Sequence, residues 1–145
     1  MVGADMTKDI LHRLRFDTKT IDTVCLLVKE HMSREVPNVK RFINRVSVEN
    51  LDKLFELQIA DIRACAPPHD ISHILNTQKE VEKILTEKQP LTVKDLKIDG
   101  YDLIAMGMQP GKQMGKMLND LLELVLDNPK LNERNTLLKY VRREK

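Results

Sequence analysis

The sequence predicts an all-α protein with several short helices and a glycine- and proline-containing turn near its C-terminus. The chain of 145 residues has three phenylalanines, two tyrosines and no tryptophan, while leucine, isoleucine, methionine, glutamate and lysine, which favour helices, dominate it. Its apolar residues recur at spacings of three and four, the pattern of one helix face. The length allows one domain or two small helical lobes.

Four helices are expected before residue 67. They cover residues 7–14, 17–31, 36–46 and 47–66, and two consecutive prolines then end the last of them, because proline cannot continue a helix. The expected caps are Asp17 or Thr18, and Ser47 with Asn50; the apolar faces consist of Ile10, Leu11, Leu14, Ile21, Val24, Cys25, Val28, Val39, Phe42, Ile43, Val46, Leu51, Leu54, Phe55, Ile59 and Ile62.

The region after residue 67 is expected to begin with a connecting helix over 71–89. Short helices over 93–97 and 101–106 follow, then a major helix over 110–126 and a final one within 131–145. The residues expected to start or stop these helices are Thr92 with Asp95 as a capping box, Gly100 as a helix breaker, Gly107 as a C-cap, Pro110 at the start of the major helix, and Asp127, Asn128 and Pro129 after it.

These elements suggest three parts in the chain. Residues 1–66 form a helical region, residues 67–89 connect it onward, and residues 90–145 form a C-terminal helical domain. The proline pair after residue 66 marks the first boundary, since it interrupts the helical pattern.

Charge and cysteine content narrow the functional classes. Lysine and arginine total 24 against 22 acidic residues, a formal net charge of +2, so a site for a polyanion must be a local patch. Arg142, Arg143 and Lys145 form a short basic end, which is interpreted as a solvated face.

Cys25 and Cys65 lie in apolar helical stretches, as expected for reduced thiols. The N-terminus lacks a leader pattern, and no apolar run reaches membrane-spanning length, so a cytoplasmic chain without a membrane partner is expected.

The adjacent pair His69-Asp70 is the first candidate for chemistry, because such a pair names a superfamily of metal-dependent phosphohydrolases. That site needs a further upstream histidine and a distant aspartate converging on one metal ion. Here the pair directly follows two prolines in a connector. Capping and lining of an exposed helix start is therefore the favoured interpretation.

The second candidate is the segment "GMQPGKQMGK", residues 107–116. A phosphate loop of the Walker A type needs four residues between its first glycine and Gly-Lys, a serine or threonine next, and a preceding strand. Here the spacing is three, Gln113 follows the lysine, and a helix precedes. What remains is a helix N-terminus with Lys112 and Lys116 on successive turns, an arrangement that favours a phosphate. The alternative is that the three glycines only allow close helix packing.

Three motifs in the C-terminal part follow one another in a characteristic order. They are a leucine-rich element over 91–96 (LTVKDL), Gly-x-Asp-Leu-Ile over 100–104, and Gly-x-x-Pro-Gly-x-x-x-Gly-x-x-Leu over 107–118. In this order they resemble the C-terminal region of bacterial tRNA nucleotidyltransferases, the CCA-adding enzymes, and of their poly(A) polymerase relatives. Residues 11–32 and the stretch "VKRFINRV" with "LFELQIADIRA" resemble the region just upstream, where some members have the end of an HD-type phosphohydrolase domain.

This resemblance implies a C-terminal domain that anchors tRNA, holding its acceptor stem and elbow through the RNA backbone. It also implies that catalysis belongs to a nucleotidyltransferase head, which holds Mg²⁺ and uses ATP or CTP and which nothing in this sequence matches. No catalytic or metal-binding residue is expected here; the start "MVGADM" fits a fragment of a longer enzyme. The implied partners are tRNA and the head and neck domains, with a second copy of the chain left open. The residues expected to contact the RNA backbone are Gly111, Lys112, Gln113 and Lys116, with Lys94 and Lys97 as neighbours.

Two other functions stay open at this point. One is a fragment of an HD-type phosphohydrolase, in which His31, Asp61, His69 and Asp70 help to hold a metal ion. The other is a helical packing or dimerisation module, in which the glycine turn only brings helices together.

Overall fold

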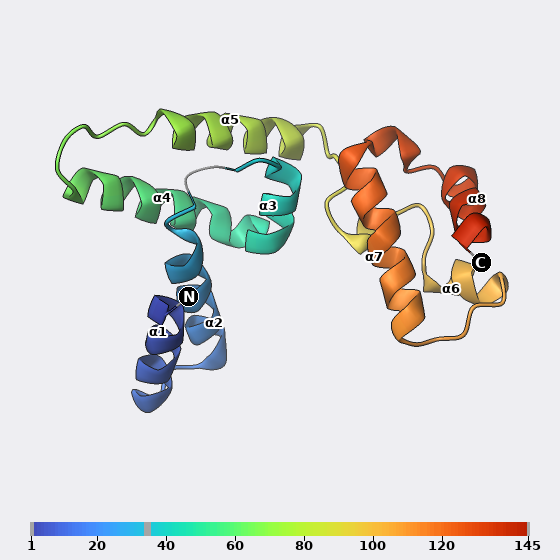
Figure 1. Cartoon of the computed structure of the whole chain (residues 1–145), viewed down its shortest axis with the longest axis horizontal. Helices are drawn as coiled ribbons and strands as arrows, with labels where there is room; N and C mark the ends of the chain where they lie inside the picture. The colour runs from blue at the N-terminus through green and yellow to red at the C-terminus, as the bar shows by residue number, and fades with distance from the viewer. Residues whose placement is uncertain (1, 34–35, 145) are drawn as a thin grey trace. The chain divides into compact units, whose positions relative to one another are not determined.

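The structure is a computed structural model that describes residues 2–33 and 36–144 (Figure 1). Within these ranges the chain contains eight α-helices, two short 3₁₀ turns and no β-strand. The prediction of an all-α fold is therefore confirmed. By contacts the chain forms two compact units, Met1–Lys83 and Ile84–Lys145.

The first unit opens with a helical hairpin of α1 (Val2–Arg13) and α2 (Thr18–Glu30). Asp17 caps α2 as expected, since its carboxylate accepts a hydrogen bond of 3.0 Å from the backbone N–H of Thr20. Helix α1 begins five residues before the expected residue 7. Its first turn lies close to α2, where the Cys25 thiol is 3.6 Å from the Ala4 carbonyl oxygen. Apolar periodicity missed this turn because small residues make the contact.

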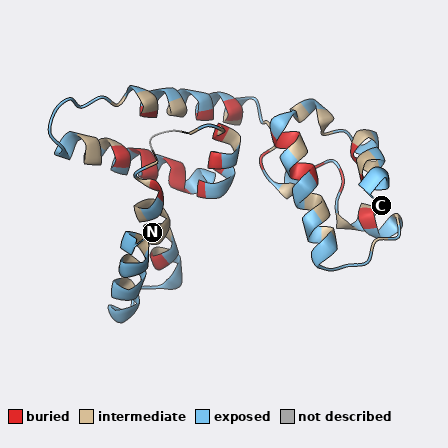
Figure 2. Cartoon of the chain, in the orientation of Figure 1, coloured by how far each residue is buried: buried red, intermediate tan, exposed pale blue. Residues whose placement is uncertain are grey.

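The remaining helices of this unit are α3 (Val39–Val46), α4 (Val48–Ala64) and α5 (Ser72–Thr86), and α5 continues into the second unit. Helix α4 ends two residues before the expected Ala66. Helices α3 and α4 pack together through Phe42 and Phe55, whose ring centroids are 6.3 Å apart. The buried apolar residues of this unit, shown red in Figure 2, are Ile21, Val39, Phe42, Ile43, Val46, Leu51, Leu54, Phe55, Ile74 and Val81.

Glu30 joins three of these helices, through its carboxylate and its backbone carbonyl oxygen. Glu30, at the end of α2, is only 4% exposed and accepts a hydrogen bond of 3.0 Å from the Arg45 guanidinium on α3. The Gln58 amide on α4 donates to the Glu30 backbone oxygen at 3.4 Å. Because a buried charge is costly without partners, the Arg45 contact ties α2 to α3, and the Gln58 hydrogen bond ties the end of α2 to α4.

The second unit is arranged around one long helix, α7 (Lys112–Asp127). The other elements are the 3₁₀ turn η1 (Val93–Asp95), α6 (Gly100–Ala105), the 3₁₀ turn η2 (Pro129–Leu131) and α8 (Arg134–Glu144). The core of this unit consists of Leu96, Ile98, Leu103, Leu121, Leu122, Val125, Leu126, Leu137 and Val141.

Two helix starts in this unit differ from the sequence predictions. Helix α6 begins at Gly100, one residue before the expected start, because the Asp99 carboxylate accepts a 2.9 Å hydrogen bond from the Tyr101 N–H and caps the helix. Glycine also fits here because a Cβ atom would lie 3.2 Å from the Met114 sulfur. Helix α7 begins two residues after Pro110, since Gly111 has a φ of 151° and cannot be helical.

The segment 93–97 forms a single 3₁₀ turn rather than the expected short helix. The capping box is present: the Asp95 carboxylate accepts hydrogen bonds from the backbone N–H of Thr92 at 2.8 Å and of Leu91 at 3.0 Å. Leu96 and Ile98 after it are both buried. Leu96 has a φ of −66° and a ψ of 144°, an extended conformation that ends the turn.

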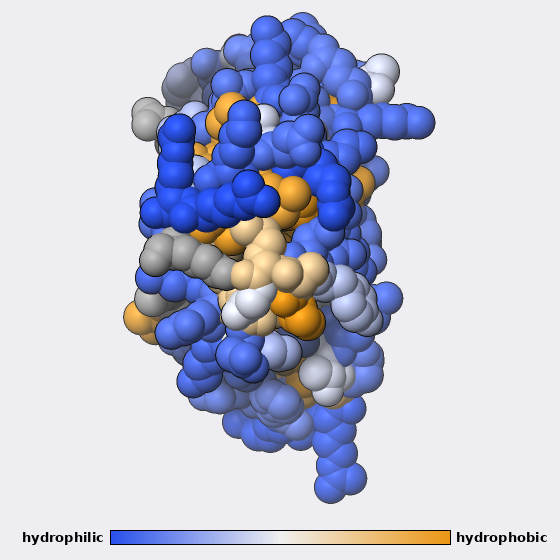
Figure 3. Space-filling view, turned by 90° about the vertical axis from the view of Figure 1, so that its right-hand side faces the viewer, coloured by the Kyte–Doolittle hydropathy of each residue, from blue (hydrophilic) through white to orange (hydrophobic). Residues whose placement is uncertain are grey.

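The surface in Figure 3 is mostly hydrophilic, with smaller hydrophobic areas between the polar side chains. No helix in the described part of the chain has the length and apolar character needed to cross a membrane.

Adjacent residues on α6 offer a test of the second core. Leu103 is fully buried, whereas its neighbour Ile104 is 45% exposed. We expect Leu103→Ala to lower the free energy of unfolding by about 2 to 5 kcal/mol, because it leaves a cavity, and Ile104→Ala to lower it by under about 1 kcal/mol. Urea denaturation followed by circular dichroism measures both. Equal losses would contradict this core assignment.

Candidate nucleic-acid interface

The glycine turn lies between α6 and α7, and two left-handed residues shape it. Gly107, just after α6, has a φ of 90°, as expected for a C-cap glycine, and Gly111, just before α7, has a φ of 151°. The first hydrogen bond of α7 runs from the Gly115 N–H to the Gly111 carbonyl oxygen. The N–H groups of the three residues before Gly115 therefore point out of the helix end, where an anion can accept from them.

The surroundings of the glycines weigh against a turn that serves close packing alone. A Cβ atom built on Gly111 or on Gly115 would meet nothing within 4 Å. The close helix contact of this region is at Gly100, outside the turn. Gly111 is needed for its backbone conformation, whereas neither conformation nor packing explains Gly115.

The basic side chains predicted for this turn are exposed. Lys112 is the first residue of α7, Gln113 follows it, and Lys116 lies one helical turn later on the same face. The open helix end and two lysine ammonium groups thus lie within the first turns of α7. This arrangement suits a phosphate group, because partial positive charge from the helix end adds to the formal charges.

Lys94 and Lys97 are exposed as well, but Lys97 belongs to the other end of α7. Its backbone N–H donates to the Asn132 side chain at 2.9 Å, and Asn132 follows Leu131. Leu131 lines one cavity together with Leu124, which is twelve residues beyond Lys112, or roughly 18 Å along the helix. The six predicted residues therefore form two groups rather than one.

Acidic side chains hold the chain segments around α7 in place. The Asp102 carboxylate accepts hydrogen bonds from the Arg134 guanidinium on α8 and from the Asp99 N–H, and these hold the pKa of Asp102 below its ordinary value. Partial burial of Asp95 raises the pKa of its carboxyl group. Even so, hydrogen bonds from the backbone N–H groups of Leu91 and Thr92 keep the pKa of Asp95 lowered.

The residues of the phosphohydrolase hypothesis are occupied by local contacts. The His69 ring is 2.8 Å from the Cys65 carbonyl oxygen. The Asp70 carboxylate accepts from the Ser72 hydroxyl at 2.6 Å and from the Ser72 backbone N–H at 2.9 Å, and these bonds lower the pKa of Asp70. His31 and Asp61 line a crevice of about 10 Å³, the size of one water molecule. Among the described residues, no three His, Cys, Asp or Glu side chains are placed to hold a metal ion.

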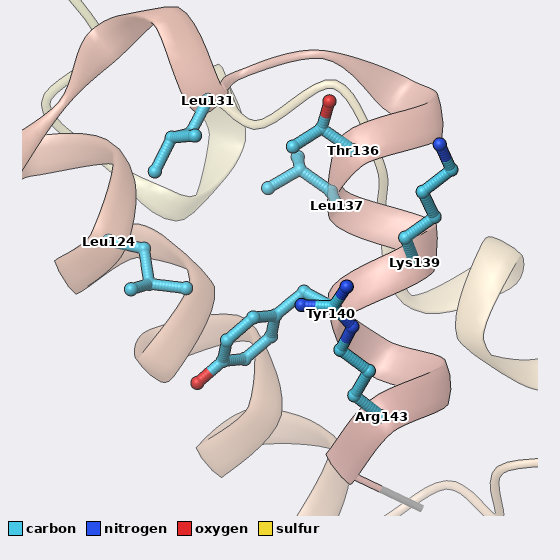
Figure 4. A pocket seen from close by; sticks show the side chains of 7 residues that line it. All are labelled: Leu124, Leu131, Thr136, Leu137, Lys139, Tyr140 and Arg143. Carbon is cyan, nitrogen blue, oxygen red and sulfur yellow. The ribbon is translucent and has the colours of Figure 1, made fainter.

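The sequence interpretation missed one cavity in this unit, at the far end of α7. It has a volume of about 260 Å³ and is shown in Figure 4. Arg143 was interpreted as part of a solvated basic end, whose last residue, Lys145, lies outside the described residues. The available signal was an aromatic residue among basic ones in "KYVRRE". The lining residues are Leu124, Leu131, Thr136, Leu137, Lys139, Tyr140 and Arg143.

Comparison with known proteins gives consistent matches over nearly the whole chain. Residues 2–141 match the family model described as "tRNA nucleotidyltransferase domain 2 putative". A CCA-adding enzyme of Lactobacillus helveticus is 30% identical over 113 residues, which cover 76% of this chain and 28% of that protein. No solved structure shows significant similarity to the chain.

Two further relatives differ in the nucleotides that their names specify. An A-adding tRNA nucleotidyltransferase of Deinococcus radiodurans is 29% identical over 131 residues, covering 84% of this chain and 29% of that protein. A CC-adding tRNA nucleotidyltransferase of Thermus thermophilus is 29% identical over 127 residues, covering 84% and 28%. The chain thus spans less than a third of the length of these relatives.

Two glycines of the turn give opposite predictions for the same substitution. Gly111→Ala should lower the free energy of unfolding by about 1 kcal/mol or more, because alanine is strained at this φ even though space is open. Gly115→Ala should raise it by roughly 0.5 to 1 kcal/mol, because alanine favours a helix interior. Thermal or urea denaturation of both variants distinguishes them; a stabilising Gly111→Ala would contradict the backbone geometry.

The capping carboxylates predict a loss of stability in acid. Because the pKa values of Asp95 and Asp102 are lower in the folded chain, their contribution is complete above the unfolded pKa of about 3.9 and disappears as the pH falls through and below that value. Unfolding free energies measured from pH 6 down to pH 3 should show this decline. Asp102→Asn should make the unfolding free energy less dependent on pH, while Asp120→Asn on the exposed side of α7 should not. Equal profiles for wild type and Asp102→Asn would refute the assignment.

Proposed function

Because the chain belongs to the tRNA nucleotidyltransferase family, matching its domain 2 model, we propose that it holds tRNA for an enzyme that extends the tRNA 3′ end. The observation that supports this proposal is the exposed start of α7, where Lys112 and Lys116 flank the open N–H groups after Gly111. In this role the chain positions the RNA and leaves nucleotide transfer to another domain.

The proposed contact is with the RNA backbone. Double-stranded RNA hides its base edges in a deep, narrow groove, so proteins hold it mainly through phosphates, 2′-hydroxyls and shape. A lysine ammonium and backbone N–H groups suit phosphate oxygens and do not discriminate bases. The glycine turn would therefore hold the acceptor stem and elbow of many tRNAs alike.

In this proposal, nucleotide binding and transfer belong to domains other than this chain. ATP or CTP and Mg²⁺ would bind a nucleotidyltransferase head, joined to this chain through a neck domain, since this chain spans under a third of its relatives. Residues 1–66 would correspond to the end of an HD-type domain. The protein would act in the cytoplasm, where tRNA maturation takes place, and a homo-oligomer is compatible with this role.

Binding of tRNA at several salt concentrations tests the proposal. Lys112→Glu with Lys116→Glu should weaken the binding of tRNA about tenfold or more, because two phosphate contacts become repulsive. The slope of log affinity against log salt should fall by about two. Fluorescence anisotropy of labelled tRNA measures both quantities.

The matched control uses Lys79→Glu with Lys83→Glu. These two lysines are exposed and lie four residues apart on α5, so the change in charge and the spacing are the same. Weakening of tRNA binding by less than about threefold is expected there. Equal weakening by both double variants would mean that tRNA responds to the net charge of the chain and not to a site at the glycine turn. Absence of tRNA binding at low salt would reject the proposal.

A further inference from the structure

The cavity at the C-terminal end of α7 has apolar walls and a basic rim. Leu124, Leu131 and Leu137 provide the walls, and the seven described residues that line it include two cations, Lys139 and Arg143, and no acid. In Figure 4 the ring of Tyr140 lies between α8 and Leu124, and the Arg143 side chain extends back along α8 toward Tyr140.

Its walls are held by contacts distant in sequence. Leu131 ends the 3₁₀ turn η2, and the next residue, Asn132, donates to the Asp95 carbonyl oxygen at 2.8 Å while accepting from the Lys97 N–H at 2.9 Å. Leu124 and Tyr140 are half-buried at the edge of the core of this unit. The cavity is thus formed before any ligand arrives, as is usual for binding sites.

Size and chemistry together restrict the occupant. A volume of about 260 Å³ lies below the range typical of drug-sized ligands, so it suits one ring system rather than two. A purely aliphatic ligand would use the leucine walls but leave Lys139 and Arg143 without an anion. A planar base with a phosphate uses both parts, because bases stack on aromatic side chains and on guanidinium groups.

We infer that this cavity receives one unpaired nucleotide of an RNA, with its base against Tyr140 and the leucine walls and its phosphate beside Lys139 and Arg143. The inference rests on the proposed function, since it takes RNA as the partner. It adds a second contact, roughly 18 Å along α7 from Lys112, and a preference for unpaired over paired segments. The hydroxyl group of Thr136, which also lines the cavity, can hydrogen-bond to the edge of the base.

The chain supplies its own reporter for this cavity. It has no tryptophan and two tyrosines, and Tyr101 is 82% exposed on α6, outside the cavity. In a Tyr101→Phe variant, Tyr140 is the one remaining tyrosine, so excitation at wavelengths that phenylalanine does not absorb reports on Tyr140. A base that stacks on its ring should quench this emission, and the titration can be corrected for absorbance with free N-acetyltyrosinamide.

The experiment compares a single-stranded oligouridylate of twelve nucleotides with a blunt RNA duplex of twelve base pairs. We expect saturable quenching by the single strand and little by the duplex. Adding Arg143→Glu should weaken binding of the single strand about tenfold. Arg142 is the adjacent exposed cation and does not line the cavity, so Arg142→Glu should weaken this binding less than threefold. Equal effects of the two arginine variants, or equal quenching by both RNAs, would overturn the inference.

Binding of tRNA gives a second, independent test. Tyr140→Phe keeps the ring and should preserve tRNA affinity, whereas Tyr140→Leu removes the stacking surface and should lower it several-fold, with folding checked by circular dichroism. If both variants bind tRNA equally well, the cavity does not receive a base.

Measurement of both tRNA binding and Tyr140 quenching distinguishes failure of this inference from failure of the proposed function. The Lys112→Glu and Lys116→Glu double variant should bind tRNA about tenfold or more weakly but keep the quenching by the single strand. If tRNA binds and Tyr140 responds to no RNA, the cavity inference alone is wrong, and an apolar side chain of another protein becomes the better occupant. If no RNA binds by either readout, both proposals fail.

Discussion

Burial of one face of α7 is the constraint on which the second unit depends. Leu121, Leu122, Val125 and Leu126 are all buried, and η1, α6 and η2 each pack against this helix. A sequence of about sixty residues has few other ways to remove enough apolar surface from water. Since the fully buried residues lie in the middle and at the end of α7, the polar side chains of Lys112, Gln113 and Lys116 at its start stay exposed for contact with a ligand.

Local interactions explain why much of the fold could be predicted from sequence. Asp17 caps α2 and Asp95 closes a capping box with contacts to residues three or four positions away, so their patterns are visible in the sequence itself. The errors had both distant and local causes. Helix α1 starts early where its first turn contacts α2, whereas the start of α6 depends on the neighbouring Asp99 cap and that of α7 on the backbone of Gly111.

In the candidate site, too, residues within one local motif could be predicted, whereas residues brought together by distant contacts could not. Lys112 and Lys116 were identifiable because the turn and the two lysines lie within one short motif. The separation of Lys97 from them, and the cavity around Tyr140, both depend on how residues after α7 return to the segment before α6. No sequence pattern of fixed spacing reports such a contact, and whether these residues bind RNA stays a prediction.

Asn132 makes the longest of these connections, since its side chain joins residues 35 and 37 positions away. Contacts of such sequence separation form late in folding, because the intervening chain must first lose its freedom, whereas caps and helical turns form early. Loss of a late contact changes the rate of unfolding more than the rate of folding. Removal of this amide should therefore speed the unfolding of the unit more than it slows its folding.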